Sequence, residues 1–179
     1  MLVAFTLLSL PAMAQSPVAI RVKARARRLH STETLVAKYT DDRRHCLYYL
    51  SSNRLYRYDA MDGKSVEVNF SQDGYDRILH AWLSNNGNMI FVAVDQSSFS
   101  DFPLLDGQVV WRINSFTGKS DQVGTGVHVE LKKNGYFLIT RYSETKDARS
   151  PHPKYYVEDF WFYDDGTPLW RKDKRLWKG

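Results

Sequence analysis

The chain has 179 residues, of which 43% are hydrophobic and 14% aromatic, and it carries a net charge of +5 at pH 7. This length and composition exclude a disordered chain and fit one folded domain with a sizeable core, and the many aromatic rings favour β-sheet. Two basic blocks near the ends, residues 20–28 and 171–178, supply the positive charge and leave a slightly acidic middle. No nucleic-acid partner is therefore expected, because the basic charge is not a property of the whole domain.

Residues 1–14 are predicted to be a signal peptide. They carry no charge, hold an apolar run broken by Pro11, and end in Ala12-Met13-Ala14, which has the A-x-A form of a cleavage site. The apolar run is too short to span a bilayer. A buried N-terminal strand is the alternative. The favoured interpretation is an exported protein, periplasmic or secreted, that begins at Gln15 and has no transmembrane span.

Residues 15–33 are predicted to form a basic N-terminal strand or arm. Apolar and basic residues alternate along it, with Ile20, Val22, Ala24 and Ala26 on one face and Arg21, Lys23, Arg25 and Arg27 on the other. Two interpretations are open. The arm binds an anionic polymer or surface through its charge, or it is an edge strand whose cations discourage pairing with other chains.

Residues 34–179 contain a repeated strand-turn-strand unit. The segment LYRYDAMDGKSVEV begins at Leu55, and VWRINSFTGKSDQV begins at Val110, with the same Gly-Lys-Ser turn in each. A shorter third copy, FWFYDDGTPLW, begins at Phe160. Repetition of this kind is typical of propellers and other arrays, in which each repeat is one small antiparallel sheet.

The strands of each repeat follow from apolar runs separated by turn residues. The sequence predicts strands over residues 35–39, 46–50, 66–70, 78–83, 89–94, 109–114, 127–131, 136–141 and 155–163, with further ones at Leu55 and Leu169. Almost no helix is expected. Two insertions, residues 95–108 and 142–154, separate the second and third strands of successive repeats, and residues 124–126 are predicted to be a loop between repeats.

This pattern resembles the blades of TolB-like propellers, which are built on the short PD40-type repeat. The segments LSNNGNMIFVAVDQ and VVWRINSFTGK carry the resemblance best, although the serine and proline that precede the first turn of that repeat are absent here. The resemblance implies four-stranded antiparallel blades around an axis and a role in protein contacts rather than chemistry. Three blades are fewer than a closed propeller uses, so we expect an irregular fourth blade that includes the N-terminal strand, a homodimer, or part of a longer ancestor.

Aromatic side chains are expected to pack between the blades, since facing sheets leave a gap that rings fill well. This set is Tyr48, Tyr56, Tyr58, Trp111, Phe160 and Trp161. Cys46, the one cysteine, excludes an intrachain disulfide and is expected in the core. The histidines lack metal-ligand spacing and no nucleophile elbow is present, so no catalytic residue, metal or cofactor is predicted.

The two insertions are the predicted binding face. In a meander the chain reverses at each turn, so both insertions lie at the same end as the connections between sheets, opposite the tight turns at Gly63 and Gly118. Long loops are common sites of binding. The candidate contact residues are Phe99, Asp101, Phe102, Leu105, Asp106, Arg149 and His152.

The favoured function is that of an exported, non-catalytic β-propeller-like protein that binds a protein or carbohydrate partner in the cell envelope. Two alternatives remain. One is an envelope enzyme acting on polysaccharide, a lyase or glycoside hydrolase, which would require a cluster of buried carboxylates with shifted pKa values. The other is a protein that binds anionic polymer through the basic arm, with an affinity that falls steeply with salt.

Overall fold

The computed structural model describes residues 16–71, 74–99, 101, 107–145 and 154–176. Twelve strands form three four-stranded antiparallel sheets in which neighbouring strands are consecutive in the chain. The first sheet contains β1 (Glu33–Asp41), β2 (Arg44–Ser51), β3 (Arg54–Asp59) and β4 (Lys64–Glu67). The second contains β5 (Arg77–Leu83), β6 (Met89–Asp95), β7 (Gln108–Asn114) and β8 (Ser120–Gly126). The third contains β9 (His128–Leu131), β10 (Phe137–Thr145), β11 (Lys154–Phe162) and β12 (Pro168–Leu176).

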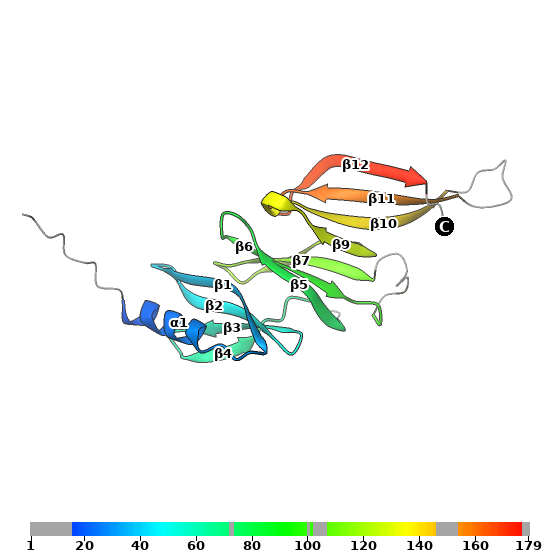
Figure 1. The fold of residues 1–179 in the computed structure, drawn as a ribbon. Helices are drawn as coiled ribbons and strands as arrows, with labels where there is room; N and C mark the ends of the chain where they lie inside the picture. The colour runs from blue at the N-terminus through cyan, green and yellow to red at the C-terminus, as the bar shows by residue number, and fades with distance from the viewer. Residues whose placement is uncertain (1–15, 72–73, 100, 102–106, 146–153, 177–179) are drawn as a thin grey trace, which may run out of the picture.

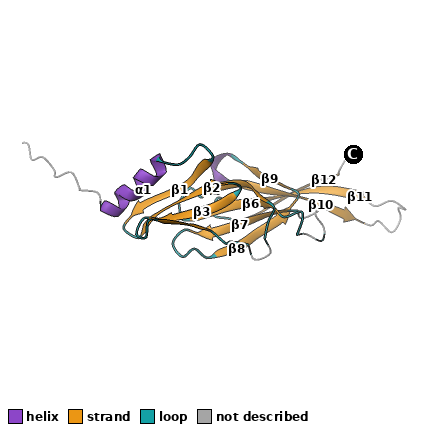
Figure 2. Ribbon diagram, turned by 90° about the horizontal axis from the view of Figure 1, so that it is seen from below, coloured by secondary structure: helices purple, strands orange, loops and turns teal. Residues whose placement is uncertain are grey.

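The all-β prediction with four-stranded antiparallel sheets is therefore confirmed. The sheets follow one another in a row, and within the described residues they do not close into a ring (Figure 1). Figure 2 shows the same row from below, with the α-helix of the described residues at the end formed by the first sheet. The helix and the third sheet thus lie at opposite ends of the molecule.

The middle sheet is buried on both faces. Along β6, Ile90 and Val92 face the first sheet, where they join a core with Tyr48. Phe91 faces the third sheet and packs against Phe137, with ring centroids 5.4 Å apart. Burial on both sides explains why β6 is almost entirely apolar instead of alternating with polar residues.

The predicted basic strand is wrong, because residues 17–27 form the helix α1 (Pro17–Arg27). Ser16 caps its N-terminus by accepting a hydrogen bond from the backbone N–H of Ala19 at 3.2 Å, and Pro17 occupies the first turn. Val22 is fully buried in a cluster with Leu47 and Tyr49. The helix therefore lies on the outer face of the first sheet and adds no strand to any sheet, so the expected strand completion of a terminal sheet is also wrong.

The second and third sheets are joined more tightly than the first and second. Only Val127 separates β8 from β9, so the predicted loop over residues 124–126 is wrong and these residues end β8. A Cβ atom built on Gly126 would lie 2.5 Å from Cγ2 of Ile139 and closer still to the carbonyl oxygen of Thr140. Glycine is therefore required where β8 passes under β10.

The first insertion lies at the expected end of the sheets, beside the connection between the first two sheets. After β6, the Gln96 side-chain amide donates hydrogen bonds to Ser71 Oγ and to the carbonyl oxygen of Gly74, in the connection between the first two sheets. The second insertion is shorter than predicted, since β10 extends to Thr145, β11 begins at Lys154, and these two residues pair.

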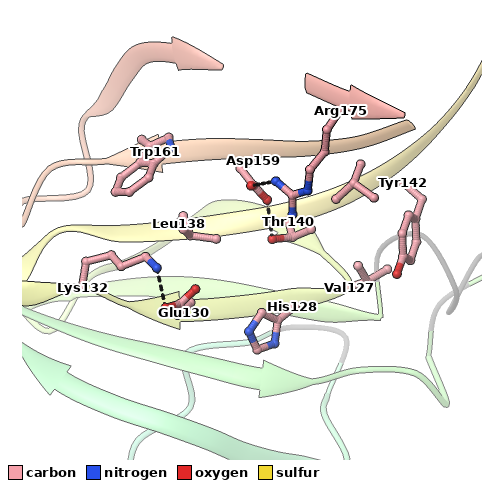
Figure 3. Close-up of a pocket in the computed structure, with 11 residues that line it drawn as sticks. Val127, His128, Glu130, Lys132, Leu138, Thr140, Tyr142, Asp159, Trp161 and Arg175 are labelled. Atoms are coloured by element: carbon pink, nitrogen blue, oxygen red, sulfur yellow. Dashed lines mark hydrogen bonds and ion pairs between the residues drawn. The ribbon is translucent and has the colours of Figure 1, made fainter. Parts of the chain in front are cut away.

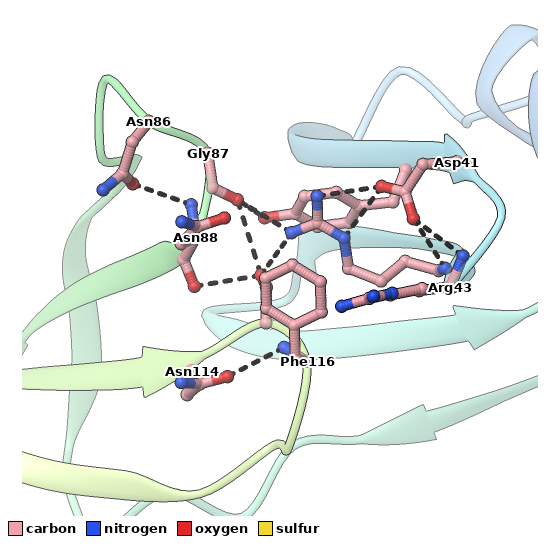
Figure 4. Close-up of polar contacts among 10 residues, drawn as sticks. Asp41, Arg43, Asn86, Gly87, Asn88, Asn114 and Phe116 are labelled. Carbon is pink, nitrogen blue, oxygen red and sulfur yellow. Dashed lines mark hydrogen bonds and ion pairs between the residues drawn. The ribbon is translucent and has the colours of Figure 1, made fainter.

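At the opposite end, Arg44 joins the first sheet to the turns of the second, and Figure 4 shows Asp41, Gly87 and Phe116 around this contact. Its guanidinium donates to the carbonyl oxygen of Gly87 at 3.1 Å and to Ser115 Oγ at 2.7 Å. It also lies between the rings of Tyr39 and Phe116, 4.1 and 4.0 Å from their centroids. These contacts fix the first sheet against the second at the end that carries the tight turns.

Candidate binding face of the third sheet

The outer face of the third sheet is the candidate functional site. It holds a shallow groove of about 620 Å³, whose lining side chains are drawn in Figure 3. Among the described residues, no helix or sheet lies beyond this face in the row of sheets (Figure 1). The groove is lined by side chains from all four strands and from the residues on either side of β9: Val127, His128, Glu130, Lys132, Leu138, Thr140, Tyr142, Val157, Asp159, Trp161 and Arg175.

Strand register gathers these residues into cross-strand rows, because alternate residues of a strand point to the same face. His128, Thr140, Asp159 and Asp173 are consecutive partners across the four strands and form the central row. Glu130, Leu138 and Trp161 form the row toward the tight-turn end, and Tyr142, Val157 and Arg175 form the row toward the loop end.

Asp159 is the centre of the polar network. It is 9% exposed, its Oδ1 accepts a hydrogen bond from Thr140 Oγ1 at 2.7 Å, and its Oδ2 forms an ion pair with Arg175. Burial alone would raise the pKa of this carboxyl, but the hydrogen bonds from Arg175 and Thr140 outweigh burial and hold the pKa below its usual value. Asp159 is therefore ionised at neutral pH, and it fixes the position of Arg175 in the groove.

Two aromatic side chains mark the ends of the groove. Trp161 Nε1 donates to Asp173 Oδ2 at 3.1 Å, and Lys132 Nζ lies 5.8 Å from the Trp161 ring centroid. Tyr142, at the other end, is 40% exposed. The rows that carry the two rings are four residues apart along β10, which corresponds to about 13 Å.

Most charges of the groove are paired. Lys132 pairs with Glu130, and Arg175 pairs with Asp159, so these two cations and two carboxylates neutralise one another, while Asp173 in the central row adds one further carboxylate. Leu138 and Val157 are only 5% and 8% exposed although no other element of the described chain covers them. The long side chains around them provide the cover, as amphipathic side chains commonly do. The outer face of the third sheet is therefore a polar groove and not an exposed apolar surface.

The residues predicted in the loops lie elsewhere or outside the described residues. Phe99 is 54% exposed with its ring against Gly74, and Asp101 is exposed. The remaining candidates lie outside the described residues: Phe102, Leu105, Asp106, Arg149 and His152. Their role in binding stays a prediction.

The four predicted arm residues lie on α1. Arg21 donates to the carbonyl oxygen of Ala60, Arg25 forms an ion pair with Glu33 at 2.9 Å, Lys23 is half-buried and Arg27 is exposed. They no longer share one face, because a helix turns successive residues by about 100°. The prediction that these four basic residues share one face is therefore wrong.

Aromatic packing follows the prediction in part. Tyr48 and Trp111 pack between the first two sheets, and Phe160 packs between the second and third. Tyr56 and Tyr58 instead pack under α1, and Trp161 lines the outer groove. The placement predicted for these last three is wrong, because the outer faces of both terminal sheets also carry rings.

The network of Thr140, Asp159 and Arg175 was not predicted. One signal for it exists in β10, where Leu138, Thr140 and Tyr142 form the outer set opposite the wholly buried Phe137 and Ile139. A polar residue in the middle of such a set indicates a face that does not enter the core. The sequence alone does not give the register that brings Arg175 to it.

Comparison with known proteins yields a weak likeness in fold. No family model matches the chain, and no curated protein matches it. A solved structure of TolB from Acinetobacter baumannii superposes with a TM-score of 0.35 at 15% identity over 73% of this chain and 31% of that chain. The chain thus spans about a third of the length of that protein, and a likeness of this strength carries no information about the site. The fold class is established by the three sheets themselves: an all-β protein of repeated four-stranded antiparallel units.

Two further observations on the described residues concern metal binding and membrane-spanning helices. No three histidine, cysteine, aspartate or glutamate side chains gather there in a way that would hold a metal ion. The helix in the described part of the chain is neither long nor apolar enough to cross a membrane.

Proposed function

We propose that this is an exported, non-catalytic binding protein whose ligand is a partner protein held on the outer face of the third sheet. The observation that supports the proposal most is the groove itself, which all four strands line and which no other described element covers. The first sheet shows by contrast what happens to an outer face that the molecule closes for itself, since α1 lies there.

The composition of the groove favours a protein partner. Trp161, Tyr142 and Arg175 belong to the three residue types that most often dominate the binding energy of protein interfaces. Arg175 is held in place by Asp159, so little side-chain freedom is lost when a partner contacts it. The mostly paired charges disfavour a strongly acidic or basic ligand and favour recognition through shape, rings and hydrogen bonds.

The alternative of a polysaccharide-cleaving enzyme receives less support from this face. Glycoside hydrolysis requires one carboxyl that stays protonated to act as the acid and a second that stays ionised. Asp159 has a lowered pKa and is bound to Arg175, so it is suited to hold a neighbour and not to donate a proton. Export is part of the proposed function, and the signal-peptide pattern of residues 1–14 supports it.

The experiment is capture of partners from an envelope extract with variants of the groove. We expect Tyr142→Ala and Arg175→Ala to lose captured protein while the melting temperature changes little. Tyr163→Ala and Arg112→Ala are matched controls, because Tyr163 is 41% exposed and Arg112 is also ion-paired, with Asp121 at 2.7 Å, away from the groove.

Equal capture by the groove variants and their controls would contradict the proposed function. A neutral oligosaccharide that binds the wild type and is lost in the same two groove variants would keep the site but replace the protein partner with a glycan. The capture and oligosaccharide arms therefore separate the position of the site from the class of its ligand.

A further inference from the structure

The helix α1 has a second apolar stripe that faces away from the protein. Ala19 and Val22 are buried against the first sheet. On the opposite side of the helix, Pro17, Ile20 and Ala24 follow one another at helical spacing; Pro17 is exposed, Ile20 is 54% exposed and Ala24 is half-buried. A helix that only covers a sheet has a polar outer face, so the apolar outer stripe requires a different explanation.

Basic residues flank this stripe. With about 100° between successive residues, Arg21 lies on one side of the stripe and Lys23 on the other, and the exposed Arg27 and Arg28 stand at its C-terminal end. Residues 16–32 contain no aspartate or glutamate. Glu33 neutralises Arg25, which lies nearest the sheet and forms no part of the outer rim.

A loop of the first sheet adds a second exposed apolar side chain at this site. Arg21 donates to the carbonyl oxygen of Ala60 at 3.4 Å, which holds the turn after β3 beside the helix. Met61, the next residue in that turn, is 67% exposed. Ile20 and Met61 therefore protrude from the same region of the molecule, with Arg21 between them.

We propose that the outer face of α1 rests on an anionic lipid bilayer. Ile20 and Met61 enter the boundary between headgroups and acyl chains, and Arg21, Arg27 and Arg28 contact lipid phosphates, as in interfacial amphipathic helices. The apolar centre distinguishes a bilayer from a soluble polyanion, which would contact the cations and gain nothing from Ile20. This inference is independent of the proposed partner site.

The position of α1 determines which way the groove faces when the molecule is bound to a bilayer. The helix and the third sheet lie at opposite ends of the row of sheets (Figures 1 and 2). A molecule that rests on a bilayer through α1 therefore presents the groove of the third sheet away from the lipid. The membrane contact and the partner site can be occupied at the same time.

The test is sedimentation of the full chain with vesicles of phosphatidylcholine alone and of phosphatidylcholine mixed with phosphatidylglycerol. The readout is the ratio of the two affinities, which isolates the charge-dependent part of binding from any contribution of the apolar residues 1–14. We expect the ratio to fall more than about tenfold in Arg27→Gln/Arg28→Gln, since each cation near an anionic surface contributes about fivefold. Lys119→Gln/Lys133→Gln removes two exposed cations from the second and third sheets and should leave the ratio unchanged.

Ile20→Ser and Met61→Ser test the apolar part of the contact, and both should weaken binding to the mixed vesicles at an unchanged melting temperature. Equal loss in the Arg27/Arg28 variant and its control would overturn the proposal. Loss of binding to a soluble polyphosphate in the charge variant, with no effect of Ile20→Ser or Met61→Ser on vesicles, would also overturn it, because the site would then recognise anions rather than a bilayer.

Discussion

The outer faces of the first and third sheets differ in how their apolar residues are kept from water. On the first sheet, Leu47 is fully buried and Tyr49 is 4% exposed, because α1 lies across them. On the third sheet, Leu138 and Val157 are almost as well shielded, but only by the long side chains around them. An outer face with large apolar residues in adjacent rows needs a covering element. A face on which apolar residues are mixed with paired charges is stable without a covering element and remains available to a ligand.

The largest effect on stability is expected in the contact between α1 and the first sheet. Val22→Asp places an unpaired carboxylate in the fully buried contact between α1 and the first sheet, and we expect the free energy of unfolding to fall by at least about 3 kcal/mol. Ile20→Asp, on the exposed side of the same helix, should change it by less than about 0.5 kcal/mol. Urea denaturation of the two variants checks this, and a similar loss in both would mean that α1 does not stabilise the first sheet.

A matched pair of leucines compares the two faces directly. Leu47→Ala should cost about 2 to 5 kcal/mol, because α1 and the sheet leave a cavity that cannot collapse. Leu138→Ala should cost about 1 to 2 kcal/mol, since water enters the groove from outside and most of the cavity cost disappears. Equal losses in urea denaturation would show that the third face is as closed as the first.

The smallest expected effect is on the melting temperature at acid pH. The pKa of Asp159 is lower in the folded protein than its usual 3.8, so the stability that its hydrogen bonds provide is complete above that value and is lost as the pH falls through the folded pKa. The melting temperature of Asp159→Asn should therefore lie below that of the wild type at neutral pH, and the difference should shrink on going from about pH 5 to about pH 2. A difference that does not depend on pH would contradict the ion pair with Arg175.

Much of the fold could be predicted because the repeats contain strong local signals. The Gly63 and Gly118 turns, the apolar run of β6 and the aromatic strands identify three antiparallel sheets before any contact is known. The alternation that begins at Ile20 misled the prediction, because Val18, Val22 and Ala26 also recur at helical spacing. Ser16 and Pro17, which favour a helix start, are the local evidence against the strand.

The candidate site could not be predicted in the same way, because it depends on which face of the third sheet is uncovered. Asp159 and Arg175 meet through the pairing of β11 with β12, whose register shifts near Phe160, and no local pattern shows that shift. The loop residues Phe102 and Arg149 were chosen from loop length alone and stay a prediction. The role of each outer face therefore depends on register and packing, which a single sequence does not display.

Site-specific photo-crosslinking tests the central claim most directly. A photoreactive phenylalanine derivative replaces Tyr142 in the groove or Tyr163 outside it, and the two positions are equally exposed at 40% and 41%. Irradiation in an envelope extract should give a discrete adduct from position 142 and none from position 163, and Arg175→Ala should abolish that adduct. An adduct at position 163 alone, or adducts of equal yield at both positions, would contradict the assignment of the third sheet's outer face as the binding site.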